Sequence, residues 1–369
     1  MSNSQPKVTF AQRSEFRQAL RQRVDSYFVS NNIRPNDNLV MYLKSAIIFG
    51  WVLGSWAFTL WGPSNVLFKI LGCIALGLGL AGFGMSVGHD ANHGSYSKNP
   101  LVNRFFSYTH EFIGVSSFLW RFRHNKLHHI YTNLQGLDVE VNGDGAVRMS
   151  PDEEYKWHHQ YQHYFIWFLY PLIPFYWFQG DLRRFIWSGD YLGHAIPKPK
   201  AGDIFDFIAP RIVSLAFFFL IPAWQGYSFL QIFVGLTISH MVYGFIVCSV
   251  FMLAHVVESV DYPAIDRSNN TVEDEWAILQ VKTSADFAPD NVFLNWYLGG
   301  LNFQTVHHLF PDVCHIHYRQ LAPIVAEVCQ EHGIQYNVYD TLGSSVASHY
   351  RWLKRLGQSA DAKAPAAIA

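Results

Sequence analysis

The chain has 369 residues, of which 50% are hydrophobic, 17% are aromatic and only 15% are charged. Soluble domains carry about 25% charged residues, so this composition argues against an ordinary soluble protein. The formal net charge of −1 gives no bulk electrostatic basis for binding nucleic acid, and we expect no nucleic-acid partner.

The N-terminal segment, residues 1–40, is polar and rich in arginine. It lacks the apolar stretch and the small-residue cleavage site of a signal peptide. Apolar side chains recur within it at helical spacing, namely Phe16, Leu20, Val24, Tyr27 and Phe28. We expect an amphipathic cytosolic helix that packs on the rest of the protein, in preference to a helix lying free on the membrane surface.

Four apolar runs are each about 20 residues long, enough to cross the ~30 Å hydrocarbon core of a bilayer. They cover residues 41–61, 66–87, 204–224 and 229–255, and short uncharged links join them in pairs. We therefore expect four transmembrane helices in two hairpins. Basic residues flank the first pair, and the positive-inside rule puts both flanks in the cytosol. These residues are Arg13, Arg17, Arg21, Arg23, Arg34 and Lys44 before the pair, and Lys98, Arg104, Arg121 and Arg123 after it.

Two shorter apolar stretches, residues 105–120 and 163–178, do not fit a membrane span. Charged residues crowd the first, and Pro171 and Pro174 interrupt the second. Aromatic side chains in the second suit the headgroup region better than the bilayer centre. We assign both stretches to the membrane interface, because a span at 163–178 would separate the last histidine cluster from the others.

Three histidine clusters follow apolar stretches: HDANH at 89–93, HNKLHH at 124–129 and QTVHH at 304–308. Helical residues three or four apart share a face, so each cluster can direct two or three imidazoles at one point. Neutral imidazole binds iron, zinc or copper, and three clusters held together could ligate two metal ions. The four cysteines form no CxxC pair and play no visible part.

Several kinds of metal protein remain open at this point. A zinc hydrolase would use three ligands and a carboxylate base, as in HExxH, which is absent here. A structural metal would need only four ligands. A di-iron oxygenase fits the number of histidines best, and a non-catalytic membrane metal-binding protein is the alternative of another class. Metal content separates the last two, since zinc in place of two irons would favour the non-catalytic protein.

The clusters resemble the three histidine boxes of membrane fatty acid desaturases. Longer stretches carry the same resemblance: WRFRHNKLHHIYTNLQGLDVE, VRMSPDEEYKW, DEWAILQVKTSADFAP and NWYLGGLNFQTVHHLFPDVCHIHY. Gln304 stands where other desaturases have a first histidine in the third box, which resembles the front-end type. Together these motifs are similar to those of cyanobacterial delta-6 acyl-lipid (linoleoyl) desaturases.

This resemblance implies a set of metal ligands. They are His89, His93, His124, His128, His129, His255, His307 and His308. Gln304, Asp90, Asn92, Asn125, Asn133 and Asp138 are candidates for the surrounding layer that holds those ligands. We interpret the other ten histidines as ordinary hydrogen-bonded residues; His240 is expected to bond between helices, and His315 and His317 to shape a docking surface or headgroup site.

The resemblance also implies a reaction: oxygen-dependent insertion of a cis double bond into a lipid-linked C18 polyunsaturated acyl chain. It implies two iron ions, dioxygen as co-substrate and reduced ferredoxin as electron donor, since no HPGG motif of a fused cytochrome b5 occurs. Possible cytosolic contacts for the donor are Arg183, Arg184, Arg211, Lys198 and Lys200. A desaturase/acetylenase or hydroxylase acting on an acyl chain carried by acyl carrier protein (ACP) is the alternative within the fold.

The predicted fold is therefore an all-α integral membrane protein. Its four transmembrane helices form two hairpins below a cytosolic helical cap that holds a histidine-ligated di-metal site. We expect the desaturase domain to cover residues 41–355 and residues 356–369 to form a disordered tail. Both termini and all three boxes are expected in the cytosol, with the protein in the thylakoid or plasma membrane of a cyanobacterium.

Overall fold

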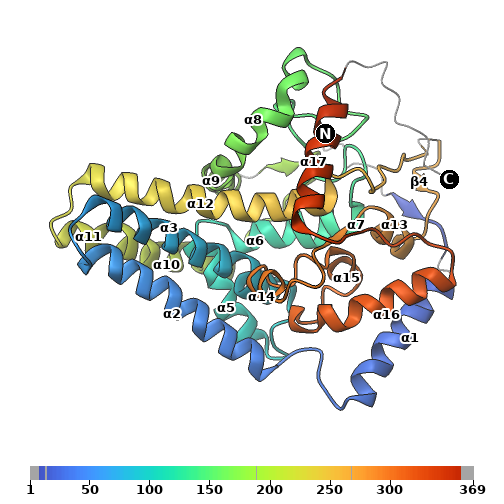
Figure 1. The fold of residues 1–369 in the computed structure, drawn as a ribbon, viewed down its shortest axis with the longest axis horizontal. Helices are drawn as coiled ribbons and strands as arrows, with labels where there is room; N and C mark the ends of the chain where they lie inside the picture. Colours follow the sequence, from blue (N-terminus) through green and yellow to red (C-terminus); the bar gives the residue numbers. More distant parts are fainter. Residues whose placement is uncertain (1–7, 13–14, 188, 267, 359–369) are drawn as a thin grey trace.

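The computed structural model describes residues 8–12, 15–187, 189–266 and 268–358 (Figure 1). Most of the expected disordered tail, residues 359–369, lies outside the described residues. The part before it is ordered, because the last helix, α17, ends at Leu356, which is buried. The described chain is mostly helical, as the sequence predicts, with three short two-stranded sheets that it did not predict.

Four helices are long and apolar enough to cross a membrane: Leu39–Trp61, Val66–His93, Ala201–Trp224 and Phe229–His255. These agree with the four predicted spans, except that the second continues to the end of the first histidine box. The first, second and fourth begin at polar caps, since Asn38, Asn65 and Ser228 each accept a hydrogen bond from a backbone N–H of the first turn. Their helices are α2 (Leu39–Trp61), α3 (Val66–Gly82) with α4 (His89–His93), α10 (Ala201–Leu215) with α11 (Ile221–Trp224), and α12 (Phe229–His255).

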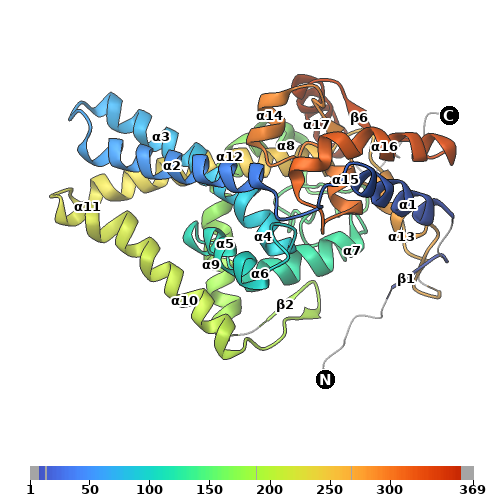
Figure 2. The same cartoon turned by 90° about the horizontal axis from the view of Figure 1, so that it is seen from below.

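The spans pack unevenly. α3 lies against both α2 and α12, and glycines bring the backbones close together. A Cβ added at Gly77 would lie 2.5 Å from the carbonyl oxygen of Ser239, so only glycine fits there. α10 is mostly exposed along its length, and Figure 2 shows it diverging from α2 and α12 toward its N-terminal end.

Shorter helices connect the spans. After the second span come α5 (Pro100–Phe112), α6 (Ser117–Trp120) and α7 (His129–Tyr131); before the third come α8 (Gln162–Leu169) and α9 (Ile173–Trp187). Neither of the two stretches assigned to the interface forms a helix that meets the length and hydropathy of a span among the described residues.

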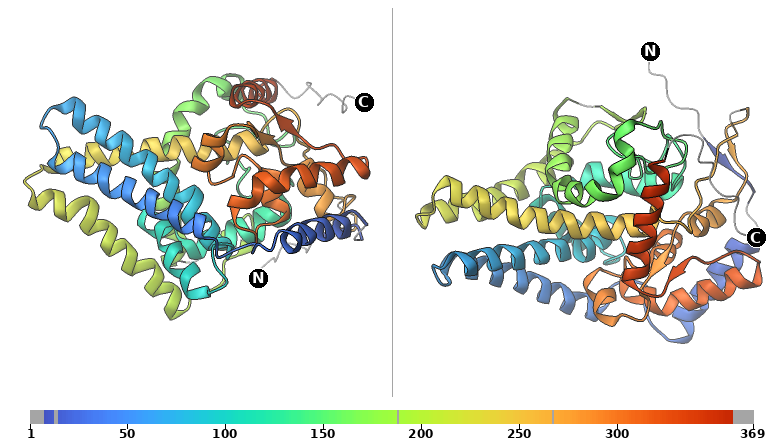
Figure 3. Two further views of the ribbon diagram at one scale, coloured as in Figure 1. Left: turned by 60° about the horizontal axis from the view of Figure 1, so that its bottom comes forward. Right: turned by 45° about the horizontal axis from the view of Figure 1, so that its top comes forward.

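The remaining helices gather at the end of the molecule away from α11, and we call this group the cap (Figures 1 and 3). It consists of α1 (Glu15–Ser30), α13 (Trp276–Lys282), α14 (Val292–Tyr297), α15 (Gln304–Leu309), α16 (Tyr318–Glu331) and α17 (Leu342–Leu356). Phe16, Leu20, Val24 and Phe28 of α1 are buried against α13 and α16, which confirms the packed amphipathic helix.

Three two-stranded sheets fasten loops around the cap. β1 (Thr9–Phe10) pairs in parallel with β4 (Thr271–Val272), and β5 (Asp286–Phe287) pairs in parallel with β6 (Val338–Tyr339). β2 (Asp190–Tyr191) and β3 (His194–Ala195) form an antiparallel hairpin. The two parallel pairings join segments far apart in sequence, whereas β2 and β3 form a local hairpin.

Two of the boxes follow or lie within π-helical turns, which the sequence did not indicate. Phe83–Gly88 precedes the first box, and Arg121–His128 contains most of the second. The backbone N–H of His89 bonds to Gly84 and that of His129 bonds to His124, both five residues back. Such turns place residues five apart on one face, and they occur frequently at functional sites.

Candidate metal centre

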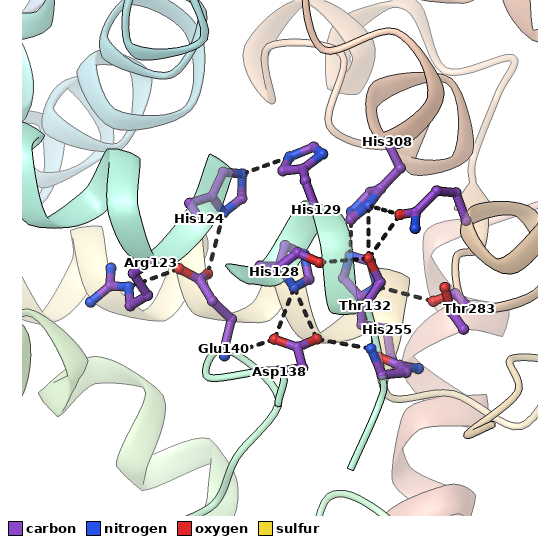
Figure 4. A network of polar contacts seen from close by, with 12 residues as sticks. Arg123, His124, His128, His129, Thr132, Asp138, Glu140, His255, Thr283 and His308 are labelled. Carbon is purple, nitrogen blue, oxygen red and sulfur yellow. Dashed lines mark hydrogen bonds and ion pairs between the residues drawn. The ribbon is translucent and has the colours of Figure 1, made fainter. Parts of the chain in front are cut away.

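The eight predicted ligand histidines come together from four elements: α4, the second box, the end of α12, and α15. Their side-chain nitrogens form three groups in which candidate ligand atoms lie within 4.8 Å of one another. The groups are His89, His93, His124 and His307; His128, His255 and His308; and His129, His307 and His308. Five of these histidines are visible in Figure 4, with their rings turned toward a common centre.

Six nitrogens of this cluster are buried without a hydrogen-bond partner among the described residues. They are Nδ1 of His89, His124 and His129, and Nε2 of His93, His128 and His307. A buried polar atom left unpaired costs on the order of 1–3 kcal/mol, so a cluster of such atoms disfavours the fold unless something binds them. Metal coordination would satisfy the Nε2 atoms of His93, His128 and His307, and the donor set fits metal ions of the iron and zinc type. Nδ1 of His124 instead faces Glu140 at 3.5 Å.

The facing pair His255 and His308 supports the same conclusion. Nδ1 of His255 lies 3.1 Å from the carbonyl oxygen of Thr283, and Nδ1 of His308 lies 2.8 Å from Oε1 of Gln280. Both partners only accept, so each Nδ1 carries the hydrogen and each Nε2 is a lone pair. The two Nε2 atoms are 3.2 Å apart. Two lone pairs repel at this separation, whereas nitrogens bound at about 2.0–2.1 Å to one metal are naturally about that far apart.

The second box provides a matching pair. Nε2 of His124 and Nε2 of His129 also lie 3.2 Å apart, although the two residues are five positions apart in sequence. An α-helix would rotate residues with this spacing away from each other, and the π-helical turn brings them onto one face. The unusual backbone therefore has a direct effect on the site.

Asp138 orients His128. Its two carboxylate oxygens lie 3.0 and 3.1 Å from Nδ1 of His128, which leaves Nε2 directed at the centre (Figure 4). Burial opposes the charged imidazole, but Asp138 outweighs it and raises the pKa of His128 above its ordinary value. Burial alone would raise the pKa of Asp138, yet His128 and the backbone N–H groups of Asn133 and Glu140 lower it. A carboxylate placed behind a ligating imidazole is a common device in metal sites.

The other ligands of the second and third boxes are held neutral. Burial, reinforced by the positive charges that neighbouring histidines would carry, lowers the pKa of His124, His129, His307 and His308 well below the ordinary value. Neutral imidazole is the form that binds a metal.

The predicted surrounding residues divide into two kinds. Asp138 and Gln304 reach a ligand ring, since Nε2 of Gln304 lies 3.0 Å from Nε2 of His255. Asn133 bonds instead to the backbone of His255 and to Asp138. Asp90 approaches Nδ1 of His89 only to 3.7 Å.

Asn92 and Asn125 fasten the first two boxes to each other. Nδ2 of Asn125 donates to the carbonyl oxygen of Asn92, and Oδ1 of Asn92 accepts from Arg121. These two asparagines therefore act on the boxes through the backbone and not through a ligand ring.

Sequence reasoning missed several residues that touch the ligands. Gln280 and the carbonyl of Thr283 fix His308 and His255, Tyr318 lies 3.3 Å from Nδ1 of His307, and Glu140 lies 3.5 Å from Nδ1 of His124. Gln280 and Thr283 each lie 28 residues from the histidine they contact, and Tyr318 lies 11 residues from His307. No local spacing could have identified them; only the resemblance of the stretches around them pointed to these regions.

The structure corrects three of the expectations for other histidines. His315 and His317 are buried and do not form a surface. His315 bonds to Asp90 through Nδ1 at 2.8 Å and to Lys44 through Nε2 at 2.7 Å, which ties the first span to the cap. His240 bonds to the carbonyl of Leu236 in its own helix, four residues back, and not between helices.

A cavity leads from the surface to the histidines. Its inner wall includes His89, His124 and Gln304, and its outer part includes the exposed residues Asp144 and Tyr176. Much of the wall is apolar, including Ile173, Val247, Phe251 and Met252. Charged and phenolic groups are concentrated in the wall formed by Arg123, Glu140, Asp181, Arg184 and Tyr191.

Comparison with known proteins agrees with this geometry. The chain is 50% identical to the sn-1 linoleoyl-lipid 6-desaturase of Arthrospira platensis, over 99% of the chain and 98% of that protein. It is 46% identical to the sn-1 linoleoyl-lipid 6-desaturase of Synechocystis sp., over 96% of the chain and 98% of that protein. An acyl-lipid (8-3)-desaturase of Physcomitrium patens is 31% identical over 94% of the chain and 72% of that protein. Residues 64–340 match the family described as Fatty acid desaturase. Its four apolar helices suit a membrane-embedded oxidoreductase. The chain belongs to the fatty acid desaturase family.

Proposed function

We propose that this desaturase is of the front-end type and inserts a cis double bond at the delta-6 position of a lipid-linked C18 polyunsaturated chain. The two relatives that share about half of their residues with the chain are named for this reaction on linoleoyl lipids. The observation that carries the proposal is the cavity that runs from exposed polar residues to the buried histidines.

We infer that two iron ions are the cofactor. One set of ligands is His89, His93, His124 and His307, and the other is His128, His255 and His308, with His129 beside both. Two irons held by these residues would supply the oxidant that removes two hydrogens from adjacent methylene carbons, with dioxygen, two electrons from the donor and two protons leaving as two water molecules. Asp138, Thr283 and Gln280 keep three imidazoles in the tautomer whose Nε2 faces inward.

The cavity supplies the positioning that the reaction needs. A delta-6 carbon lies close to the ester group, so polar contacts for the ester must lie near the histidines. Arg123 directly precedes His124 and lines the cavity together with Arg184 and Tyr191, which suits the ester side. The apolar wall around Val247 and Phe251 suits the longer methyl end of the chain.

We propose that the four spans form two hairpins with the cap, all three boxes and both termini in the cytosol. Uncharged links join α2 to α3 and α11 to α12, and the basic residues that flank these helices lie at the opposite ends. Lys69 is an exception at the link end of α3, where it donates to the carbonyl oxygens of Thr59 and Gly62. Residues 41–355 then form the desaturase domain, with the 163–178 stretch at the membrane interface. The cyanobacterial relatives favour a thylakoid or plasma membrane.

Reduced ferredoxin is the proposed electron donor, because the relatives of nearly equal length are cyanobacterial and no HPGG motif occurs in the chain. The basic residues expected to contact it are not all accessible. Arg211 forms an ion pair with the buried Glu111, and Arg184 lies over the ring of Tyr191 at 4.5 Å and lines the cavity. Arg183, Lys198 and Lys200 remain candidates.

Product analysis tests the function. The chain is expressed with ferredoxin in a host whose lipids contain linoleate but no delta-6 unsaturation, and the double bonds of each lipid class and of acyl-ACP are mapped. We expect a new delta-6 double bond in glycerolipid, and none in cells with His128→Ala, which removes one proposed ligand. A triple bond, a hydroxyl group or a product confined to acyl-ACP would contradict the proposal.

A further inference from the structure

One helix of the cap contacts the metal centre at two places. Nε1 of Trp276, the first residue of α13, donates a hydrogen bond to the carbonyl oxygen of His129 at 2.9 Å. Four residues later, Oε1 of Gln280 accepts from Nδ1 of His308 at 2.8 Å. Residues four apart lie on one face of a helix, so a single face of α13 bonds to a histidine of the second box and to one of the third.

Trp276 also reaches the surface. Its side chain is only partly buried, and the guanidinium of Arg17 lies over its ring at 5.0 Å. Among the described tryptophans, Trp276 alone hydrogen-bonds to one of the box histidines. Figure 1 places α13 at the end of the cap remote from α11, where a soluble protein can approach if the cap is cytosolic.

This arrangement is suited to electron transfer. Electron tunnelling weakens steeply across gaps and much less through covalent and hydrogen bonds. From the indole ring, one hydrogen bond leads to the backbone of His129, and the His129 ring stacks on that of His308 with centroids 4.4 Å apart. An electron that reaches Trp276 is thus one hydrogen bond from the chain segment that carries the second box.

The charges around Trp276 are mixed but contain an accessible basic part. Arg17 and Arg21 are four residues apart on α1, and Lys126 is exposed in the second box between His124 and His128. Arg21 also forms exposed ion pairs with Asp25 at 3.5 Å and Asp312 at 3.9 Å, so Arg17 and Lys126 carry more of the basic character. The acidic neighbours are Glu273, Asp274 and Glu275, the second of which pairs with Lys282. A weak, transient electron-transfer contact needs only a small interface whose charges complement those of an acidic carrier.

We propose that α13 is the electron entry point and that an acidic iron–sulfur carrier docks over Trp276 and Arg17. This inference rests on the proposed function, since it requires the histidines to hold a redox metal. Each double bond needs two one-electron transfers: two reduced carriers are oxidised, dioxygen and two protons are consumed, and two hydrogens leave the acyl chain, giving two water molecules. Trp276 itself is neither oxidised nor reduced in the net reaction.

The test compares two reductants on the iron-loaded protein. Reduced plant-type [2Fe–2S] ferredoxin must dock, whereas dithionite with methyl viologen reaches the metal without a specific contact. Single-turnover reduction is followed optically for wild type, Trp276→Leu and Trp276→Phe, and iron per chain is measured for each. Trp157→Leu is the matched control, because Trp157 is 73% exposed and contacts no box histidine among the described residues.

We expect Trp276→Leu to slow reduction by ferredoxin roughly tenfold or more, with iron content and reduction by dithionite unchanged. Trp276→Phe, which keeps a ring but loses the N–H, should be intermediate, and Trp157→Leu should match wild type. Arg17→Glu should raise the ferredoxin concentration needed for half-maximal rate, whereas Lys354→Glu, an equal charge change at an exposed position of α17, should not.

Other outcomes overturn the proposal. Unchanged ferredoxin kinetics in Trp276→Leu would place the entry point elsewhere while leaving the desaturase function intact. Iron loss, or equal slowing with both reductants, would show that Trp276 merely supports His129. Failure of ferredoxin to reduce the wild-type protein would refute the proposed donor and the entry point together, whereas delta-6 products with another donor would preserve the reaction.

Discussion

Single residues set the direction of each ligand atom in this centre. An acceptor at one nitrogen of an imidazole fixes the hydrogen there and leaves the other nitrogen as a lone pair for a metal, and Asp138, Thr283 and Gln280 provide three such acceptors of different chemistry. Only the carboxylate among them carries a charge, and it raises the pKa of His128 above its ordinary value against the effect of burial. The centre therefore combines one imidazole that bonds to a charged carboxylate, His128, with two that bond to neutral acceptors, His255 and His308.

Gln304 allows a graded test at this scale. Its amide lies 3.0 Å from Nε2 of His255, so it occupies space beside a proposed ligand atom. We expect Gln304→His to keep part of the activity, because an imidazole can take a ligand-like place there. Gln304→Leu should lose most of it, since the amide is replaced by an apolar group. Delta-6 product per bound iron is the measurement, with the exposed Gln320→Leu as control. Full activity of Gln304→Leu would exclude a role for the amide.

Asp286 gives a prediction for pH. Burial raises its pKa to about 6, although hydrogen bonds from Tyr336 and the backbone of Thr305 oppose the rise. The folded state therefore binds a proton more tightly than the unfolded state. Its contribution to stability is present below the ordinary pKa of about 4 and is lost as pH rises through about 6.

The isosteric Asp286→Asn variant should not show this loss of stability with rising pH, because asparagine does not titrate. Between pH 4.5 and 7.5, the melting temperature of the metal-free protein should fall less in the variant than in the wild type. The difference corresponds to a free energy of unfolding of at most roughly 3 kcal/mol. Asp340→Asn, an exposed site, serves as control. Equal pH dependence in all three proteins would mean that Asp286 keeps an ordinary pKa in the fold.

At the scale of elements, close helix packing depends on small residues. α3 contacts both α2 and α12, and a Cβ at Gly77 would meet the carbonyl oxygen of Ser239 at 2.5 Å and the Cβ of Val242 at 2.7 Å. Gly50 in α2 has nothing within 4 Å of the same position. The two glycines therefore differ only in what surrounds them.

Alanine at these two positions tests the packing. Gly77→Ala should destabilise the protein by roughly 1–3 kcal/mol, because the added methyl forces α3 and α12 apart. Gly50→Ala should be neutral or slightly stabilising, since alanine favours a helix. Melting temperature in detergent measures both. If Gly77→Ala is as stable as Gly50→Ala, α3 and α12 do not approach as closely as described.

At the scale of the whole molecule, the sidedness of the membrane helices can be measured. In a background without the four native cysteines, single cysteines replace exposed Asp190, Asp340 and Gln225. We expect an impermeant thiol reagent to label Gln225→Cys in intact cells, because this residue lies in the link between α11 and α12. Asp190→Cys and Asp340→Cys should react only after the cytosolic face is opened.

Two results would contradict this topology. Labelling of Asp190→Cys from outside would show that the 163–178 stretch crosses the membrane. Labelling of Asp340→Cys from outside would show that the chain near the third box lies on the non-cytosolic side of the membrane. The shared metal site would then need another explanation. A bilayer of ~30 Å is too thick for one site to draw ligands from both faces.

The sequence by itself determined the spans, the amphipathic N-terminal helix and the identity of the histidines that gather at one centre. The spans and the amphipathic helix follow from local composition and spacing, which hydrophobic burial and helix geometry convert directly into structure. The spacing of the boxes predicted a metal site, whereas the full set of histidines, His255 above all, came from the resemblance to desaturases. Only the tertiary structure decided which nitrogen of each ring faces inward, because the partners Gln280, Thr283 and Tyr318 come from distant segments. It also decided the π-helical turns, which no local pattern indicated, and the burial of His315, which depends on its contacts with Asp90 and Lys44, both far away in sequence.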